Sequence, residues 1–148
     1  MNRRKPDRIG RIRRVRRFVG CVILESLTDA EPLAGLTPVV ERVVDVPTDP
    51  DATTWHVRWY CLDESDLLER LPGLSAAMRP HWYGHFITGD DLCVILPGQV
   101  FWARVSDKST WCDFIAYGDT VGVERKWTEN IPTGLPAYVR EALAVEWP

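Results

Sequence analysis

The chain has 148 residues, of which 45% are hydrophobic and 26% charged, and its formal net charge is −3. This length and composition are typical of one globular domain with a buried core. No run approaches the roughly 18–20 apolar residues that a membrane-spanning helix needs. The four cysteines form no C-x-x-C pair, which excludes a zinc ribbon and a thioredoxin motif.

The charges divide near residue 17. Residues 1–17 hold eight Arg and one Lys against a single acidic residue, Asp7. The whole chain has 18 basic and 21 acidic side chains, so the other 131 residues hold 9 and 20, a net charge of −11. We expect this basic arm to be disordered, because its like charges repel one another and it lacks apolar periodicity.

Three interpretations of the basic arm are open. It can bind nucleic acid or another anionic surface through the release of counterions. It can contact the acidic body of its own chain. It can also lie upstream of the native start of translation, for which Val15 is a candidate codon. In each case the predicted domain comprises residues 18–148.

The first half of this domain predicts three strands. Residues 18–27 are apolar and β-branched, and Glu25 together with the lack of a small-residue cleavage site favours a strand over a signal peptide. Residues 39–46 form a second strand that ends before Pro47. Residues 53–62 alternate between large apolar and polar side chains, which indicates a half-buried strand.

The second half predicts helices around an antiparallel meander. The acidic segment 63–66 is followed by leucines at helical spacing, which indicates a helix. Three meander strands follow, at residues 81–87, 92–96 and 100–105. The next helix has Thr110 as N-cap and Gly118 as C-cap, and a last helix covers 135–147. Together these elements predict an α+β fold: an antiparallel sheet of five or six strands, with two or three helices packed mainly on one face.

A candidate binding surface follows from the period of two along these strands. Trp55 and Trp59 point to one side of their strand, and Trp82 and Phe86 to one side of theirs. If these large apolar residues share the core face, the opposite face gathers His56, Arg58, Tyr60, His81, Tyr83, His85, Trp102 and Arg104. Such a face suits a protein, a peptide or a small anionic ligand, because aromatic rings offer flat contact area and Arg a planar fork. An ordinary solvated face with cross-strand pairs gives the same pattern.

The sequence offers little support for a metal, a cofactor or a nucleophilic enzyme. His81 and His85 lie roughly 13 Å apart on one strand, at about 3.3 Å per residue, so they cannot share an ion. There is no H-E-x-x-H, no glycine-rich phosphate loop and no G-x-S-x-G elbow. The cysteines lie in apolar runs or a predicted helix. We therefore expect buried free thiols in a cytoplasmic protein, at Cys21, Cys61, Cys93 and Cys112.

Several short motifs gather in the central part of the chain. They are Trp82-Tyr-Gly-His-Phe86, Asp107-Lys-Ser-Thr-Trp111, Tyr117-Gly118 and Gly122-Val123. Together they resemble a family of small uncharacterised bacterial proteins whose pattern includes W-Y-x-H-F, D-K-S-T-W and Y-G. The resemblance covers residues 53–123, and Glu124 stands where the family pattern has Pro. It implies a bacterial cytoplasmic protein and, since the family has no assigned activity, no catalytic residue.

The leading functional hypothesis is a binding or accessory module that presents the aromatic sheet face to a protein, peptide or small anionic ligand. The first alternative is a small enzyme in which His85 or His56 acts as general base and Arg58 holds an anion. The second alternative is a nucleic-acid binder that acts through residues 1–17.

Overall fold

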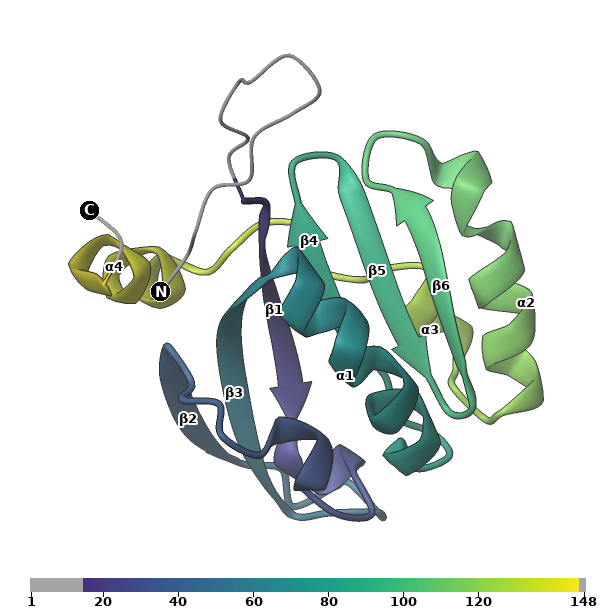
Figure 1. Cartoon of the computed structure of the whole chain (residues 1–148). Helices are drawn as coiled ribbons and strands as arrows, with labels where there is room; N and C mark the ends of the chain where they lie inside the picture. Colours follow the sequence, from purple (N-terminus) through teal and green to yellow (C-terminus); the bar gives the residue numbers. More distant parts are fainter. Residues whose placement is uncertain (1–14, 147–148) are drawn as a thin grey trace.

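The computed structural model describes residues 15–146, which contain one antiparallel sheet of six strands (Figure 1). The strand order is β2-β3-β1-β4-β5-β6, and with its helices the sheet makes the predicted α+β fold. The strands are β1 (Arg17–Ile23), β2 (Val40–Asp45), β3 (Thr54–Asp63), β4 (Gly84–Thr88), β5 (Asp91–Leu96) and β6 (Gln99–Arg104). The helices are α1 (Glu64–Ala77), α2 (Cys112–Thr120), α3 (Arg125–Thr128) and α4 (Ala137–Glu146), with short 3₁₀ turns η1 (Leu24–Ser26), η2 (Glu31–Leu33) and η3 (Lys108–Trp111).

The pairing of the strands identifies the two faces of the sheet, because residues opposite each other in an antiparallel ladder point to the same side. Tyr60 pairs with Gly20, and Gly20 pairs with Phe86. This row lies on the side that α1 covers, the α1 face. Cys21 pairs with both Trp59 and His85, so that row lies on the opposite side, the α2 face. Figure 1 shows α1 crossing the front of the sheet, and the chain between α3 and α4 passing behind it.

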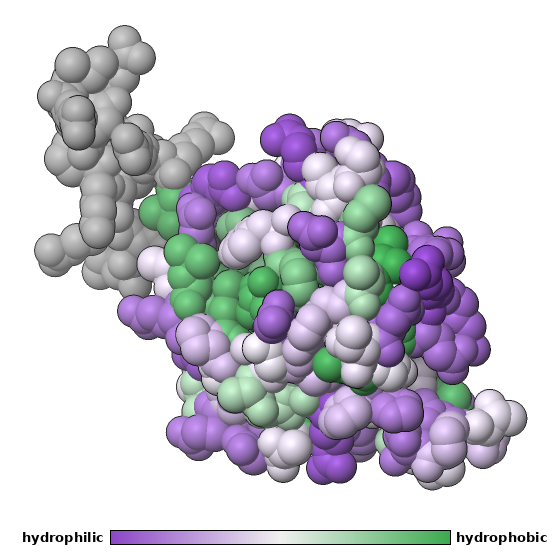
Figure 2. Space-filling view, turned by 90° about the vertical axis from the view of Figure 1, so that its right-hand side faces the viewer, coloured by the Kyte–Doolittle hydropathy of each residue, from purple (hydrophilic) through white to green (hydrophobic). Residues whose placement is uncertain are grey.

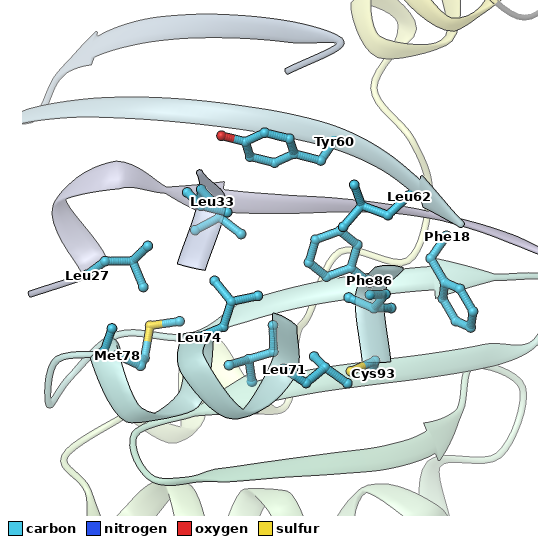
Figure 3. Close-up of a cluster of buried hydrophobic side chains, with 14 of the residues drawn as sticks. Phe18, Leu27, Leu33, Tyr60, Leu62, Leu71, Leu74, Met78, Phe86 and Cys93 are labelled. Carbon is cyan, nitrogen blue, oxygen red and sulfur yellow. The ribbon is translucent and has the colours of Figure 1, made fainter. Parts of the chain in front are cut away.

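The α1 face carries the larger buried cluster, which Figure 3 shows between α1 and the strands. From α1 it takes Leu67, Leu71 and Leu74, which recur at helical spacing and are at most 5% exposed. The helix begins after Asp63, and its first turn holds two acidic residues, where the helix dipole favours negative charge. The expected amphipathic helix is thus present, and its apolar stripe forms one wall of the core.

A glycine in β1 allows two aromatic rings to share the centre of this face. A Cβ atom at position 20 would lie 2.3 Å from the ring of Phe86 and 2.3 Å from the carbonyl oxygen of His85. Because Gly20 pairs with Tyr60 on its other side, the row runs aromatic, glycine, aromatic across β3, β1 and β4. The glycine therefore leaves the space that the Phe86 ring fills.

The other helices lie on the α2 face. Trp111 and Phe114 pack there with their ring centroids 5.4 Å apart, and both are 1% exposed. Tyr138 of α4 accepts a hydrogen bond from Trp59 Nε1 at 2.9 Å, which places α4 on the same side. α3 packs against α2 where Thr128 meets Gly118. Three of the four described helices thus lie on one face, as predicted, while α1 covers the other alone.

Two strands lack three or more of the residues predicted for them. β1 ends at Ile23 because the next three residues turn into η1, where the hydroxyl of Ser26 donates to the carbonyl of Ile23 at 2.6 Å. β4 begins only at Gly84. His81 has a φ of 79°, in the left-handed region, which a strand does not accommodate.

The predicted caps of α2 are wrong. Thr110 lies in η3, and Trp111 is the N-cap residue of α2. Gly118 lies within the helix, which continues to Thr120. A Cβ atom at Gly118 would lie 3.0 Å from Cγ2 of Thr128, so the glycine serves close packing rather than termination. Among the described helices, none has both the length and the apolar character needed to cross a membrane.

Candidate functional site

The predicted binding face is not formed as a single surface. Its construction required Trp59 and Phe86 to share a face, but the register sets Phe86 beside Gly20 and Tyr60 on the α1 face. Trp59 instead lies on the α2 face with His85. The prediction was wrong because alternation within one strand does not determine how neighbouring strands are aligned.

Five of the eight predicted residues do share the α1 face, but at two separate places. His56, Arg58 and Tyr60 follow one another along β3, next to the edge strand β2. Trp102 and Arg104 lie on β6, the strand at the opposite edge of the sheet. Trp102 is 48% exposed, and its ring meets Phe18 edge-on at 5.8 Å. The remaining three residues, His81, Tyr83 and His85, lie outside both groups.

His85 is a buried structural histidine. It is 4% exposed, and its ring lies edge-on to Trp59 with centroids 6.1 Å apart. Burial lowers the pKa of His85 to about 4, although a hydrogen bond to the backbone of Pro132 opposes this shift. The imidazole is therefore neutral near pH 7 and is enclosed between the sheet and the segment that leads to α4. It does not fit the role of an accessible general base.

His81 and Tyr83 also have local structural roles. The His81 ring lies against Gly122, where a Cβ atom would come within 3.2 Å of its Nε2. Tyr83 packs against the α2-face cluster. Burial, with a smaller effect of Cys21, raises the pKa of Tyr83 to about 12, so its hydroxyl stays protonated.

The four cysteines are free, as expected, but they are not all buried. Cys93 is buried, and burial raises the pKa values of Cys21 and Cys93 to about 12, so both remain thiols. Cys112 is exposed, contrary to the prediction. It opens α2 between Trp111 and Phe114, which both turn into the core, so position 112 faces outward.

At the β2 side of the sheet, His56 is held by a carboxylate from a distant part of the chain. Glu25, in η1, brings Oε2 within 2.7 Å of His56 Nδ1, and its Oε1 accepts the backbone N–H of His56 at 2.5 Å. Partial burial opposes ionisation of Glu25, but the hydrogen bonds from His56 outweigh it and lower the Glu25 pKa. The His56 side chain remains 36% exposed, so an oriented imidazole is accessible here. No sequence pattern predicted this pair, whose members are 31 positions apart.

Arg58 and Tyr60 continue the same row toward the core. Arg58 forms an ion pair with Glu41 of β2. The nearby Tyr60 oxygen, and then the Glu41 carboxylate, raise the pKa of Arg58. Tyr60 is 1% exposed, and its hydroxyl has no well-formed hydrogen bond within residues 15–146. Figure 3 shows this hydroxyl pointing away from Leu62.

The edge of β6 is closed at its C-terminal end. Val105 N–H donates to Asp90 O at 2.8 Å, in register with the β5–β6 ladder, so backbone groups of Val100, Trp102 and Arg104 point outward. At Arg104 both groups are satisfied: its N–H donates to Thr110 Oγ1 at 2.9 Å and its C=O accepts from Trp111 Nε1 at 2.8 Å. The Asp107–Trp111 motif thus closes this end of the edge. Figure 2 shows the side of the molecule where β6 and α2 lie, with an apolar area among hydrophilic side chains.

The edge of β2 has no comparable closure. Val46 N–H donates to Thr53 O at 2.8 Å, in register with the β2–β3 ladder, so Glu41, Val43 and Asp45 direct their backbone groups outward. Within residues 15–146, no side chain or loop forms a hydrogen bond with these outward groups. All of β2 after its first residue is exposed, and Val43 reaches 59%. The exposed edge was not predicted from the sequence, although the charged and β-branched pattern of β2 is typical of an edge strand.

Other features of residues 15–146 are weaker candidates for a binding site. A shallow, open hollow lies between η2 and α1, lined by Thr28, Asp29, Glu31, Pro32, Gly73, Ala76 and Ala77. The Asp29 carboxylate there already accepts the backbone N–H of Glu31 at 2.9 Å. No group of three or more metal-ligating side chains occurs among the residues that the structure describes.

The described end of the basic arm contacts the acidic body. Arg16 lies 2.8 Å from Asp91 Oδ2 and 3.6 Å from Glu64 Oε2, and Arg17 lies 3.4 Å from Asp63 Oδ1. Exposed pairs of this kind each contribute about 0–1 kcal/mol. The rest of the arm, and with it the hypothesis of nucleic-acid binding, falls outside the described residues.

Comparison with known proteins finds no family model, no curated protein and no solved structure that matches the chain. The resemblance to a bacterial family over residues 53–123 stays an expectation. Within the described residues, the candidate site is the β2 edge with the row of His56, Arg58 and Tyr60 beside it.

Proposed function

We propose that the protein is a binding module that accepts an extended strand of a protein or peptide partner along the edge of β2. The observation that carries this proposal is the line of outward backbone groups at Glu41, Val43 and Asp45, which find no partner among residues 15–146. In strand addition, such groups supply main-chain hydrogen bonds, and the neighbouring side chains select the partner. The four free thiols fit a reducing compartment, so we place the module in the cytoplasm.

The character of β2 favours a specific partner over nonspecific aggregation. Natural proteins protect edge strands with charges, and β2 carries Glu41, Arg42 and Asp45. Val43 and Val44 are 59% and 41% exposed, one on each face of the strand, and offer apolar area to an added strand. β6 is a poorer site, because a strand added there would meet the turn that closes the edge at Arg104.

A proline substitution tests the proposal, because it removes one backbone donor. At Val43 the N–H points away from β3, so Val43→Pro keeps the β2–β3 ladder and removes the central donor of the free edge. The probe is the heptapeptide Thr-Lys-Thr-Val-Thr-Lys-Thr, titrated into ¹⁵N-labelled full-length protein. We expect amide shift changes centred on positions 41–45, and at least tenfold weaker binding in Val43→Pro.

The matched control is Val43→Thr, which keeps the N–H and the β-branched shape and should bind like the native protein. Thermal unfolding of both variants checks that the fold is retained. The proposal fails if the native chain does not bind the peptide, if Val43→Pro binds as well as the native chain, or if the shifts centre on Val100 and Trp102 of β6.

A second candidate function rests on the Glu25–His56 pair. A histidine oriented by a carboxylate is the arrangement that general bases use, and Arg58 lies two residues further along the same face to hold an anion. We propose His56, rather than the buried His85, as the base of such an enzyme. Hydrolysis of activated carboxylate and phosphate esters serves as the probe. His56→Gln should then slow turnover by about 10²–10⁴-fold, whereas a native rate equal to buffer alone rules this candidate out.

A further inference from the structure

The outward positions of β2 place three side chains in one line. Glu41, Val43 and Asp45 all lie on the α1 face, because each pairs with a residue of β3 that lies on that face. In an antiparallel ladder, the residues of an added strand that stand directly opposite these three also point to the α1 face. A partner strand therefore sets its residues i, i+2 and i+4 against Asp45, Val43 and Glu41.

This line is acidic at both ends and apolar in the middle. Val43 is 59% exposed, so a branched apolar side chain opposite it would cover surface that is now in water. Asp45 is exposed and forms no ion pair within residues 15–146, and Glu41 contacts Arg58 on its β3 side. A Lys or Arg opposite each carboxylate would form a cross-strand pair, whereas Asp or Glu there would be repelled. The net charge of −11 on residues 18–148 adds a longer-range preference for a basic partner.

The other face of β2 restricts the intervening positions of the partner. Those positions lie beside Arg42 and Val44, on the α2 face. The guanidinium carbon of Arg42 lies 3.6 Å from the centroid of the Tyr138 ring, and this cation–π contact holds a positive charge there. A basic side chain at an intervening position would meet that charge. Neutral residues such as Thr or Val avoid it.

Resting on the proposed function, we infer that the partner strand follows the pattern basic, neutral, branched apolar, neutral, basic. The partner is a separate protein or peptide rather than a second copy of this chain. Antiparallel pairing of β2 with itself, centred on Val43, would set Glu41 against Asp45 on both sides of the axis. Centred on Arg42, it would set two guanidinium groups against each other, and centred on Val44 it would set Val43 against Asp45 with no basic residue opposite a carboxylate. In this complex, main-chain hydrogen bonds supply the affinity, and the charge pairs supply the specificity for the partner.

A charge exchange across the edge tests this inference. Thr-Lys-Thr-Val-Thr-Lys-Thr and the same peptide with Glu in place of Lys are titrated into the native chain and into Asp45→Lys. We expect the Lys peptide to bind the native chain at least about fivefold more tightly than the Glu peptide. Asp45→Lys should remove or reverse that preference. Glu69→Lys, the same change of charge on the exposed side of α1, should leave it intact.

The outcomes separate this inference from the proposed function. If both peptides bind the native chain equally, and binding still depends on the N–H of Val43, the charge pattern is wrong and strand addition stands. If neither peptide binds, strand addition itself fails. If Glu69→Lys changes the preference as much as Asp45→Lys, the preference reflects only the overall negative charge, and the inference is overturned. Dimerisation in analytical ultracentrifugation that Val43→Pro abolishes would identify a second copy as the occupant, which also overturns it.

Discussion

The two edges of the sheet are built differently. At β6, the chain returns after the strand and uses the hydroxyl of Thr110 and the indole of Trp111 to satisfy both outward groups of Arg104. At β2, the outward groups of Glu41, Val43 and Asp45 find no such partner within residues 15–146. Within residues 15–146, side chains of the same chain thus close the C-terminal end of the β6 edge, whereas no part of the β2 edge is closed in this way. Because an unpaired edge strand can pair with a strand of another chain, β2 is the edge at which we expect a partner strand to bind.

The position of α4 strengthens this comparison. α4 lies close to β2, because Tyr138 contacts both Arg42 and Trp59. These contacts place it over the α2 face of the outer two strands, where it does not cover the backbone edge. Among residues 15–146, the helix on this side of the sheet thus covers the face, and the outward groups of the edge have no hydrogen-bond partner.

The largest effect we expect is a loss of unfolding free energy in acid. It arises from His85 on the α2 face and leaves the outward groups of β2 unchanged. The folded pKa of His85 is about 4, against 6.5 for the free side chain. As the pH falls from 6.5 to 4, the unfolded chain therefore binds a proton at His85 that the folded chain does not bind. The free energy of unfolding therefore has its full value above pH 6.5 and falls by about 3 kcal/mol between pH 6.5 and pH 4.

Urea unfolding as a function of pH measures this loss directly. In His85→Gln, which does not titrate, the slope between pH 6.5 and pH 4 should become much flatter. An unchanged slope would show that His85 is not the group responsible, and that its surroundings admit the charged form.

A smaller effect should follow from opening the closed edge. Thr110→Val removes the hydroxyl that accepts the N–H of Arg104 at 2.9 Å, so we expect a loss of about 1 kcal/mol in unfolding free energy. Hydrogen exchange at the Arg104 amide should become faster. Thr120→Val serves as control, because its hydroxyl bonds to the carbonyl of Tyr117 at the end of α2, away from the edge. If exchange at Arg104 is equally slow in Thr110→Val, the Thr110 hydroxyl does not close the edge.

Much of the fold could be predicted from local sequence signals. Alternating side chains located β3, leucines at helical spacing located α1, and short turns located the meander of β4, β5 and β6. The β4 residues failed to join those of β3 and β6 in the predicted binding face, because strand register decides which faces align and alternation does not report it. Gly20 is the relevant clue, because a glycine in the middle of an apolar strand often marks the close approach of a neighbouring side chain. Here that neighbour is Phe86.

The candidate site was less accessible to sequence reasoning. The Glu25–His56 pair joins residues 31 positions apart, and no spacing rule connects them. Thr110 matched a helix-capping pattern, but tertiary structure directs its hydroxyl to the backbone of Arg104 instead. Both cases depend on which strands become neighbours. By contrast, His56, Arg58 and Tyr60 do share one side of β3, as its period of two predicted. That side was expected to lie opposite the core, however, and Tyr60 is instead part of the buried cluster under α1.

Amide hydrogen exchange in the full-length protein tests the central comparison most directly. Without a partner, the amides of Glu41, Val43 and Asp45 should exchange almost as fast as those of an unstructured peptide, while the Arg104 amide exchanges much more slowly. Addition of Thr-Lys-Thr-Val-Thr-Lys-Thr should slow exchange at the three β2 positions and leave Arg104 unchanged. Slow exchange at Val43 without any partner, or no slowing when the peptide is added, would contradict the account.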